Sequence, residues 1–387
     1  NHRFFKPWLQ YIRYHKMYTM KKTTILLFLV LYNLNLIKSQ CNCVALGTPP
    51  ASQAVTITPI QGITGIQNAI NSATGPKTIY LASGTYDVGT TYINVTKPNI
   101  TIRSVSGNQN DVIIKGTGML SLSGTYHGIS ILHRKCTIAD LTIRDIDTHP
   151  IDINFWYQTG PIDSTLIHNV HIIDGGEQLI KMSYSGVTTQ SGDNGIIECC
   201  TIEYSTSLPG SNFYTNGIDL HYAKNWIIRD NILRNIKHGP STTTDAGPAI
   251  LFFKQGVNPL IERNKIINCD EGISLGNWVD NPNISCYGGT LRNNMVLGHT
   301  NSRCGLLAVL CPSANIINNT VYSPGGIAFT AQQYAIEITG SVTANCLIQN
   351  NLCDETWYNN SNLAPPPTLT TNNFSITIAH LSSTVST

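Results

Sequence analysis

The seven residues 227–233 read IIRDNIL, in which two aliphatic runs flank a polar Arg-Asp-Asn step. Seven other segments repeat this form at intervals of roughly 25 to 33 residues, which is the signature of a repeat protein. They are TIADLTI, LIHNVHI, IIECCTI, LIERNKI, TLRNNMV, NIINNTV and CLIQNNL, with corners at Asp140, Asn169, Cys199, Arg263, Asn293, Asn319 and Asn351 to the nearest residue. The polar step therefore predicts a corner between two short strands that recurs along the chain.

Composition indicates strands rather than helices in these copies. Ile, Val, Thr and Asn dominate, and the 3.6-residue period and the Ala, Leu, Glu and Lys content typical of helices are missing. Because so short a unit cannot bury its apolar face alone, the copies must stack as coils about 4.8 Å apart. Stacked corners bring equivalent Asn side chains together, where their amides can hydrogen-bond from coil to coil. The sequence predicts an all-β solenoid with an internal Asn ladder.

The corner repeats resemble those of the pectate-lyase-like superfamily, a family of secreted parallel β-helix proteins. GIQNAINSA (65–73), followed by TIYLASGTYDV (78–88), is similar to the capping helix and first coil of that family. DGGEQLIKMS, YTNGIDLHYAKNWIIRDN, GPAILFFKQG and ERNKIINCDEGISLGN resemble a group of its members that mostly lack an assigned activity. The resemblance implies a right-handed parallel β-helix of three parallel sheets with an N-terminal capping helix.

An export signal precedes this domain. Met20 opens KKTTILLFLVLYNLNLIKS, in which a basic pair, an apolar run and a mixed tail are typical of a secretory signal peptide. We expect an upstream extension at 1–19, a signal peptide at 20–39, a linker at 40–54, the β-helix at 55–355 and a C-terminal cap or tail at 356–387. The protein is then secreted, and no membrane segment remains after signal cleavage.

Charge and cysteine content limit the partners of the secreted chain. Without residues 1–39 it keeps 17 Lys and Arg against 22 Asp and Glu, a net charge of −5. This balance provides no basic patch for nucleic acid, so we expect no nucleic-acid partner and a monomer. All 11 Cys follow the signal peptide, and their odd number leaves at least one thiol outside intrachain disulfides. Sequons that fit a glycosylating pathway occur at Asn94, Asn99, Asn283, Asn318, Asn359 and Asn373.

The strands that precede the corners align into rows of outward polar side chains. PIDIN (150–154), LIKMS (179–183) and GIDLH (217–221) each alternate, with their aliphatic residues pointing inwards. Asp152, Lys181 and Asp219 then project outwards side by side. A parallel second row consists of Asn154, Ser183 and His221. The next coils continue the rows with Leu251, Phe253 and Ser274.

Two chemistries suit this outward face. Coils about 4.8 Å apart separate the carboxylates of Asp152 and Asp219 by about 9.6 Å, close to the roughly 6.5 to 9.5 Å of inverting glycoside hydrolysis. In β-elimination from a uronic acid polymer, a cation neutralises the substrate carboxylate and Lys181 removes the acidified proton, with His221 beside it. Hard oxygen ligands for Ca²⁺ are available from Asp152, Glu177 and Asp219. We also expect Lys181 to lower the pKa of both aspartates by proximity.

Substrate contacts are expected around the same face. The candidate residues are His149, Asn154, Glu177, Ser183, Tyr214, Asn216 and Tyr222. EQLIKMS (177–183) also resembles the Glu-, Lys- and Ser-bearing strand of the chondroitinase B and alginate lyase family, whereas the NTD, DD, GHG and RIK segments of polygalacturonases and the WIDH and RxPxxR segments of pectate lyases are missing. We expect a protein that acts on an extracellular polysaccharide, as a lyase or an inverting hydrolase. The alternative is a non-catalytic carbohydrate-binding or structural surface protein.

Overall fold

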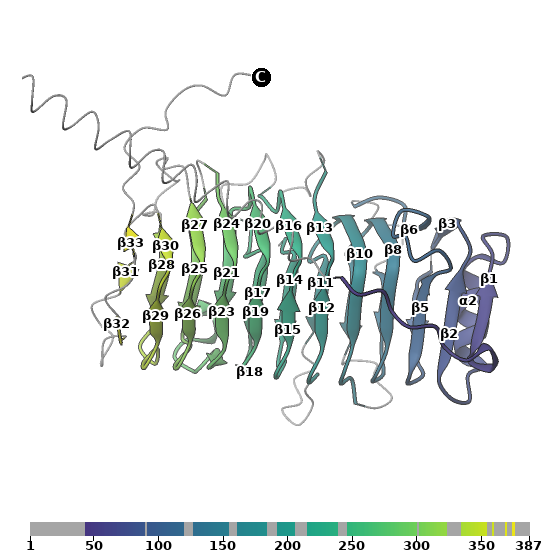
Figure 1. Ribbon diagram of the computed structural model, residues 1–387, viewed down its shortest axis with the longest axis horizontal. Coiled ribbons are helices and arrows are strands. Elements are labelled where there is room, and N and C mark those ends of the chain that lie inside the picture. The colour runs from purple at the N-terminus through teal and green to yellow at the C-terminus, as the bar shows by residue number, and fades with distance from the viewer. Residues whose placement is uncertain are drawn as a thin grey trace, which may run out of the picture. The chain divides into compact units, whose positions relative to one another are not determined.

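The structure is a computed structural model. It describes residues 43–89, 91–119, 127–154, 161–183, 192–205, 215–238, 246–299, 302–322 and 334–353, and the pairs 358–359, 368–369 and 374–375. Within the compact unit Ala45–Thr387, the chain winds into coils that follow one another from β1 to β33 (Figure 1). All strand pairings among these residues are parallel, and they form three columns that run along the stack.

The first column comprises β1 (Ala54–Ile57), β2 (Lys77–Leu81), β5 (Ile100–Ser104), the first halves of β8 (Thr137–Ile146) and β10 (Leu166–Gly175), β12 (Ile196–Glu198), β15 (Ile227–Arg229), β19 (Leu260–Glu262), β23 (Thr290–Arg292), β26 (Asn315–Ile317), β29 (Leu347–Gln349) and β32 (Thr368–Leu369). The second column comprises β3 (Gly84–Asp87), β6 (Val112–Lys115), the second halves of β8 and β10, β13 (Thr201–Glu203), β16 (Ile232–Arg234), β20 (Lys265–Ile267), β24 (Met295–Leu297), β27 (Thr320–Tyr322), β30 (Leu352–Cys353) and β33 (Phe374–Ser375).

The third column comprises β4 (Ile93–Val95), β7 (His127–Ile131), β9 (His149–Asn154), β11 (Ile180–Ser183), β14 (Ile218–His221), β17 (Ile250–Phe253), β21 (Glu271–Leu275), β25 (Cys304–Val309), β28 (Tyr334–Thr339) and β31 (Tyr358–Asn359). The remaining elements are η1 (Ala51–Gln53), α2 (Gly62–Asn71), η2 (Trp278–Asp280) and the paired strands β18 (Gly256–Val257) and β22 (Cys286–Tyr287). The prediction of three parallel sheets is confirmed, although β8 and β10 run through the corner and join the first two columns into one continuous sheet.

Aliphatic side chains fill the inside of the coils. In the first column each inward residue pairs with its equivalent one coil on, and all are at most 1% exposed: Ile138, Ile167, Ile197, Ile228, Ile261, Leu291, Ile316 and Ile348. Burial of one such side chain contributes about 1.5 to 3 kcal/mol, so the ladder is the main source of stability. It also fixes the register, because a slip by one residue would turn the aliphatic set outwards.

The corner between the first two columns requires a left-handed backbone. Its residue has a φ between 51° and 60° in every described coil from β8 to β30: Asp140, Asn169, Cys199, Asp230, Arg263, Asn293, Asn318 and Asn350. Asn and Asp tolerate this conformation best among residues with a side chain, which explains the polar step of the repeat. The sequence placed the last two corners at Asn319 and Asn351, whereas the left-handed residues are Asn318 and Asn350, one position earlier.

The residue after each corner points its side chain into the coil. In five successive coils it is a buried Asn: Asn231, Asn264, Asn294, Asn319 and Asn351. The Nδ2 of Asn231 donates to Oδ1 of Asn264 at 3.0 Å, and the Nδ2 of Asn264 donates to Oδ1 of Asn294 at 3.1 Å. The same Oδ1 of Asn264 accepts the backbone N–H of Asn231 at 3.1 Å. The predicted Asn ladder is therefore present, and it satisfies backbone groups as well as side chains.

The helix α2 covers the open end of the first coil. Ile66 and Ile70 on one face of this helix are fully buried against the coil. Gln67 on the same helix accepts from the backbone N–H of Asn94 and donates to its carbonyl, both at 3.0 Å. Because an uncovered strand edge would pair with other chains, these two bonds protect β4. The predicted capping helix is confirmed.

At the other end, β31, β32 and β33 continue all three columns beyond residue 355, where the sequence suggested that the β-helix stops. The proposed extension and signal peptide lie outside the described residues. In the part of the chain that is described, each helix is too short or too polar to cross a lipid bilayer.

Seven cysteines of the described ranges are buried and form no disulfide, whereas Cys43 and Cys199 are disulfide-bonded; the seven are Cys136, Cys200, Cys269, Cys286, Cys304, Cys311 and Cys346. Burial raises the pKa of the Cys136 thiol to about 12, which keeps the group protonated and unreactive near neutral pH. The unbonded cysteines therefore serve as small apolar core residues.

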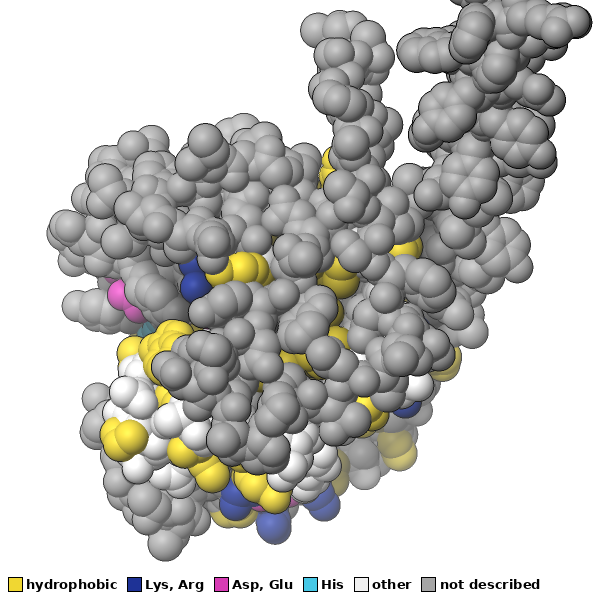
Figure 2. Space-filling model, turned by 90° about the vertical axis from the view of Figure 1, so that its left-hand side faces the viewer, with side chains coloured by type: hydrophobic (Ala, Val, Ile, Leu, Met, Phe, Trp, Pro, Cys, Tyr) yellow, Lys and Arg dark blue, Asp and Glu magenta, His cyan; other side chains and the backbone are white. Residues whose placement is uncertain are grey.

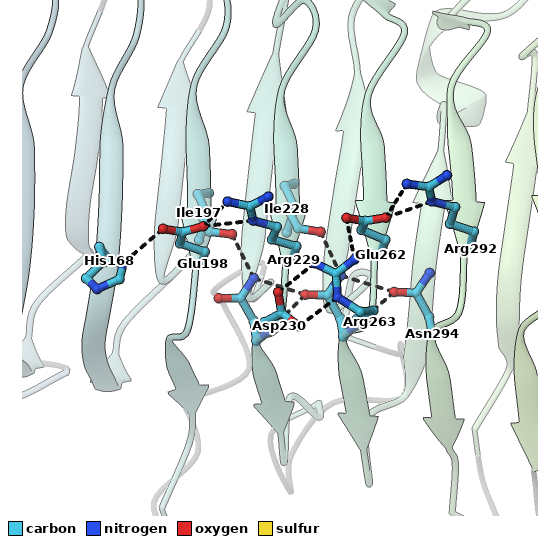
Figure 3. A network of polar contacts seen from close by, with 12 residues as sticks. His168, Ile197, Glu198, Ile228, Arg229, Asp230, Glu262, Arg263, Arg292 and Asn294 are labelled. Carbon is cyan, nitrogen blue, oxygen red and sulfur yellow. Dashed lines mark hydrogen bonds and ion pairs between the residues drawn. The ribbon is translucent and has the colours of Figure 1, made fainter. Parts of the chain in front are cut away.

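The outer surface of the first column carries a ladder of ion pairs (Figure 3). Glu198 lies 3.0 Å from His168 Nδ1 and 2.6 Å from Arg229 Nη2, which stands on the next coil. Further along, Glu262 binds both Arg263 and Arg292. In the end view of Figure 2, Lys and Arg side chains gather along one edge of the described surface. The arginine ends of these pairs are 28% to 43% exposed, so water screens them and they adjust the stacking without deciding it.

Replacing Asn264 by Ala should destabilise the protein by about 3 kcal/mol, because it leaves the Asn231 N–H and the Ile228 carbonyl without partners in a dry interior. Urea unfolding followed by circular dichroism measures the loss. Asn110→Ala is the control, since this Asn is exposed, and it should stay near wild type. Equal urea midpoints for the two variants would show that the Asn ladder is not a source of stability.

Candidate functional site

The outward face of the third column carries the polar row predicted from the sequence. Asp152 on β9, Lys181 on β11 and Asp219 on β14 are direct cross-strand neighbours. Each is flanked by buried aliphatic residues, so the alternation of the strand turns its side chain outwards. The row continues with Leu251 and then Ser274, as expected. We call the surface around Asp152, Lys181 and Asp219 the polar face.

Lys181, Asp219 and His221 form a closed triangle on this face. The Nζ of Lys181 lies 2.9 Å from Oδ2 of Asp219 and 2.9 Å from Nε2 of His221. The same Nε2 lies 3.1 Å from Oδ1 of Asp219. Asp219 is only 1% exposed, whereas the side chains of Lys181 and His221 are 12% and 15% exposed. The carboxylate is thus a buried anchor that positions two basic groups near the surface.

Asp152 anchors a second group of side chains. Its Oδ2 accepts from Nδ2 of Asn154 at 2.7 Å and lies 3.6 Å from Nε2 of His127 on the preceding coil. The ring of His127 stacks on that of His149, with centroids 5.4 Å apart. Asp152 is also 1% exposed, so it too positions a partner instead of meeting solvent.

His149 and Glu177 lie at the edge of the polar face. The Nδ1 of His149 donates to the carbonyl of Gln178 at 3.1 Å, since a carbonyl only accepts. Its Nε2 lies 3.6 Å from Oε2 of Glu177. With its side chain 33% exposed, Glu177 is the carboxyl of this group that reaches solvent most.

The surroundings move the pKa values of the two aspartates apart. Burial raises the pKa of Asp152, and nearby His127 and Asn154 offset this only in part. Burial acts on Asp219 as well, but the nearby His221 and the charge of Lys181 outweigh it and hold the pKa below its ordinary value. Lys181 lowers the pKa of both aspartates, as expected, but at Asp152 burial outweighs this effect and the net shift is upward.

Burial keeps the imidazoles neutral. It lowers the pKa of His221, although Asp219 acts in the opposite direction. It also lowers the pKa of His149, to about 3, with His127 adding to the effect. For Glu177, burial raises the pKa and Lys181 offsets part of this. Near neutral pH the polar face thus offers neutral imidazoles beside one ammonium group.

Apolar side chains border the face on its C-terminal side. Leu251 and Phe253 pair with Asp219 and His221, and the ring of Phe253 meets that of His221 edge-on, with centroids 4.4 Å apart. On the other side, Ser130 pairs with Asp152. Ser130 and His127 were missed from the sequence, but the strand HGISI that holds them would have emerged by extending the strand alignment one coil towards the N-terminus.

Several predicted substrate contacts have other roles. Asn216 is fully buried and donates to the carbonyl of Pro248 at 2.9 Å, so it supports the chain behind the face. Asn154 is 7% exposed and positions Asp152, while Tyr222 is 9% exposed and offers little surface to a sugar. Ser183 pairs with Asn154 and is partly exposed. Tyr214 lies outside the described residues.

The expected Ca²⁺ ligands do not fit a calcium site. Asp219 faces Lys181 and His221, Asp152 faces Asn154, and Glu177 lies beside His149. In the ranges that the structure describes, no group of three or more His, Cys, Asp and Glu side chains comes together in a way that could hold a metal ion. Ca²⁺ needs six to eight oxygen ligands around one point, and the two buried aspartates are instead engaged with nitrogen partners.

Comparison with solved structures finds similar architectures at low sequence identity. The Dettilon tailspike protein matches with a TM-score of 0.53 and 14% identity, over 86% of this chain and 70% of its own. The alginate lyase from Paenibacillus sp. str. FPU-7 matches with a TM-score of 0.48 and 16% identity, over 84% and 99%. For the pectate lyase Pel9A the TM-score is 0.41 and the identity 10%, over 84% and 78%. At such identities the likeness concerns the fold alone.

Comparison of sequences gives the family. No curated protein matches the chain. The family model described as "Right handed beta helix region" matches residues 99–286 and 153–353, which is more than half of the chain. These matches cover the corners, the Asn ladder and the polar face described above, and the chain belongs to the right-handed β-helix family.

Proposed function

We propose that the protein cleaves an extracellular acidic polysaccharide by β-elimination at the polar face. The observation that carries this proposal is the difference in exposure between the carboxylates and the basic groups. Asp152 and Asp219 are 1% exposed and face basic partners, whereas Lys181, His221 and Glu177 reach solvent. A bound sugar would meet an ammonium, an imidazole and one carboxyl. Inverting hydrolysis needs two carboxyl groups that contact substrate and water, which this arrangement disfavours.

The contacts favour His221 over Lys181 as the base. The ammonium group of Lys181 donates to Asp219 at 2.9 Å and has no lone pair with which to accept a proton. Because an ammonium only donates, Nε2 of His221 is the acceptor in their 2.9 Å contact and carries the lone pair. When Lys181 turns to the substrate carboxylate, Nε2 is free to take a proton. Asp219 then stabilises the imidazolium that forms.

The elimination step balances with these groups. His221 takes the proton from the carbon next to the carboxyl group, and Lys181 stabilises the negative charge that develops on that carboxyl. The electron pair forms a carbon–carbon double bond, and the bond to the glycosidic oxygen breaks. Glu177, whose pKa is raised by burial, supplies the proton to the departing oxygen. The products are a chain that ends in an unsaturated uronate and a chain with a new hydroxyl.

Lys181→Ala and His221→Asn should each lower the rate of elimination by roughly 100-fold or more, since they remove charge stabilisation and the base, respectively. The assay follows the ultraviolet absorbance of the unsaturated product with alginate, polygalacturonate and hyaluronan. Lys115→Ala is the matched control, because this lysine is exposed on β6 in the second column, away from the polar face, and it should keep wild-type activity.

Other outcomes would support an alternative function or a different base. New reducing ends without absorbance would establish hydrolysis. Polysaccharide binding without either signal would make the protein a non-catalytic binding module. If His221→Asn kept full activity while Lys181→Ala lost activity, Lys181 would be the base.

The pH dependence follows from His221. Its neutral form is the active base, so kcat/KM should rise with pH through the pKa of this group and fall again at the pH where Glu177, the proton donor, ionises. Because burial lowers that pKa from its ordinary value of 6.5, the rise should be complete below the pH at which a free histidine titrates. A profile whose midpoint lies above 6.5 would contradict the assignment.

We further propose that the protein is exported. Cys43 and Cys199 are both disulfide-bonded. This supports export, since disulfides form and persist in oxidising compartments. Asn283 and Asn318 are exposed and stand in N-x-S/T sequons. Expression in a eukaryotic host should place the protein in the medium, and removal of N-glycans should lower its mass. The mass that is lost on removal of N-glycans should be smaller for Asn283→Gln than for wild type, by one glycan. Retention of the whole product in the cytosol would refute export.

A further inference from the structure

A second recess lies on the third column, C-terminal to the polar face. It is a cavity of about 140 Å³. Its wall includes Pro248, Glu271, Ser274, Trp278, Arg303 and Leu307. Ser274 and Leu307 belong to the same outward row as Lys181 and Asp219. Ser274 stands three coils of about 4.8 Å from Lys181, so one polymer lying along the stack can reach both places.

The polar groups of this cavity suit an uncharged ligand. The Nε of Arg303 donates to Oε1 of Glu271 at 2.5 Å, and its Nη1 lies 3.7 Å from Oε2 of Glu337. One guanidinium therefore faces two carboxylates. An anionic ligand would be repelled, whereas a hydroxyl can accept from Arg303 and donate to Glu271.

An aromatic ring stands at the same cavity in a fixed position. Trp278 is 44% exposed and opens the short helix η2. The side chain of Asn277 caps this helix by accepting from the N–H of Val279 at 3.0 Å, and Asp280 at its end pairs with Lys254 at 2.9 Å. The backbone that carries the indole is therefore held at both ends before any ligand arrives. A large aromatic face packs well against the C–H face of a sugar ring.

We propose that this cavity is a subsite for one uncharged sugar residue. This inference rests on the proposed function and extends it to the class of substrate. An acidic residue binds at Lys181 and a neutral one at Trp278 and Arg303, with the apolar Leu251 between them. The substrate is then a polysaccharide in which uronic acid and neutral sugars are mixed, not a polymer of uronic acid alone. The small volume agrees with a single ring.

Calorimetric binding to two defined polymers tests the subsite. Hyaluronan alternates uronic acid with an uncharged N-acetylhexosamine, and polygalacturonate contains uronic acid only. Wild type should bind hyaluronan more tightly than polygalacturonate. Trp278→Ala should weaken hyaluronan binding about tenfold and leave polygalacturonate binding unchanged. Tyr287→Ala is the control, since this ring on β22 is also exposed, at 53%, but does not line the cavity.

The outcomes separate this inference from the proposed function. If Trp278→Ala weakens hyaluronan binding while wild type cleaves neither polymer, the subsite stands and the elimination activity fails. If wild type cleaves polygalacturonate as well as hyaluronan and Trp278→Ala changes neither, the activity stands and the subsite is refuted. Equal loss of binding for both polymers, or binding of neither, also overturns the subsite.

Discussion

The whole structure depends on parallel pairing between each strand and its equivalent about thirty residues later in the chain. This constraint makes every inward position repeat an aliphatic residue, because each contacts its own counterpart above and below. It also makes each corner repeat a left-handed residue, which Asn and Asp adopt at least cost. The outward positions carry no such restriction. The polar face exists because three successive coils place Asp152, Lys181 and Asp219 on these unrestricted positions.

The sequence predicts the repeated parts of the fold well because stacking constrains them. The coil period, the Asn ladder and the capping helix follow from residue types that recur, and so does the register of Asp152, Lys181 and Asp219. The corner position was wrong by one residue at Asn319 and Asn351, where two adjacent Asn make the step ambiguous. The strands β31 to β33 are too short and too polar to stand out in the sequence.

The electrostatics of the candidate site could not be read from the alternation alone. Periodicity places Asp152 and Asp219 outwards, but outward residues are not always exposed, and both proved almost fully buried. The opposite pKa shifts of these two residues follow from their different partners. Asp219 faces an ammonium across one strand spacing, whereas Asp152 has an imidazole and an amide beside it. Likewise, the Ca²⁺ expectation counted carboxylates without knowing that Asp152 and Asp219 already had nitrogen partners.

The Asn ladder has a direction. From Asn231 to Asn319 each side-chain amide donates to the Asn of the next coil, so the amide dipoles add along the axis. Hydrogen bonds in such a chain polarise and strengthen one another, which couples coils that do not touch. A coil that opens at one end therefore weakens the bonds of the coils behind it. Unfolding of this stretch should then spread as a front from an end of the ladder instead of starting at its centre.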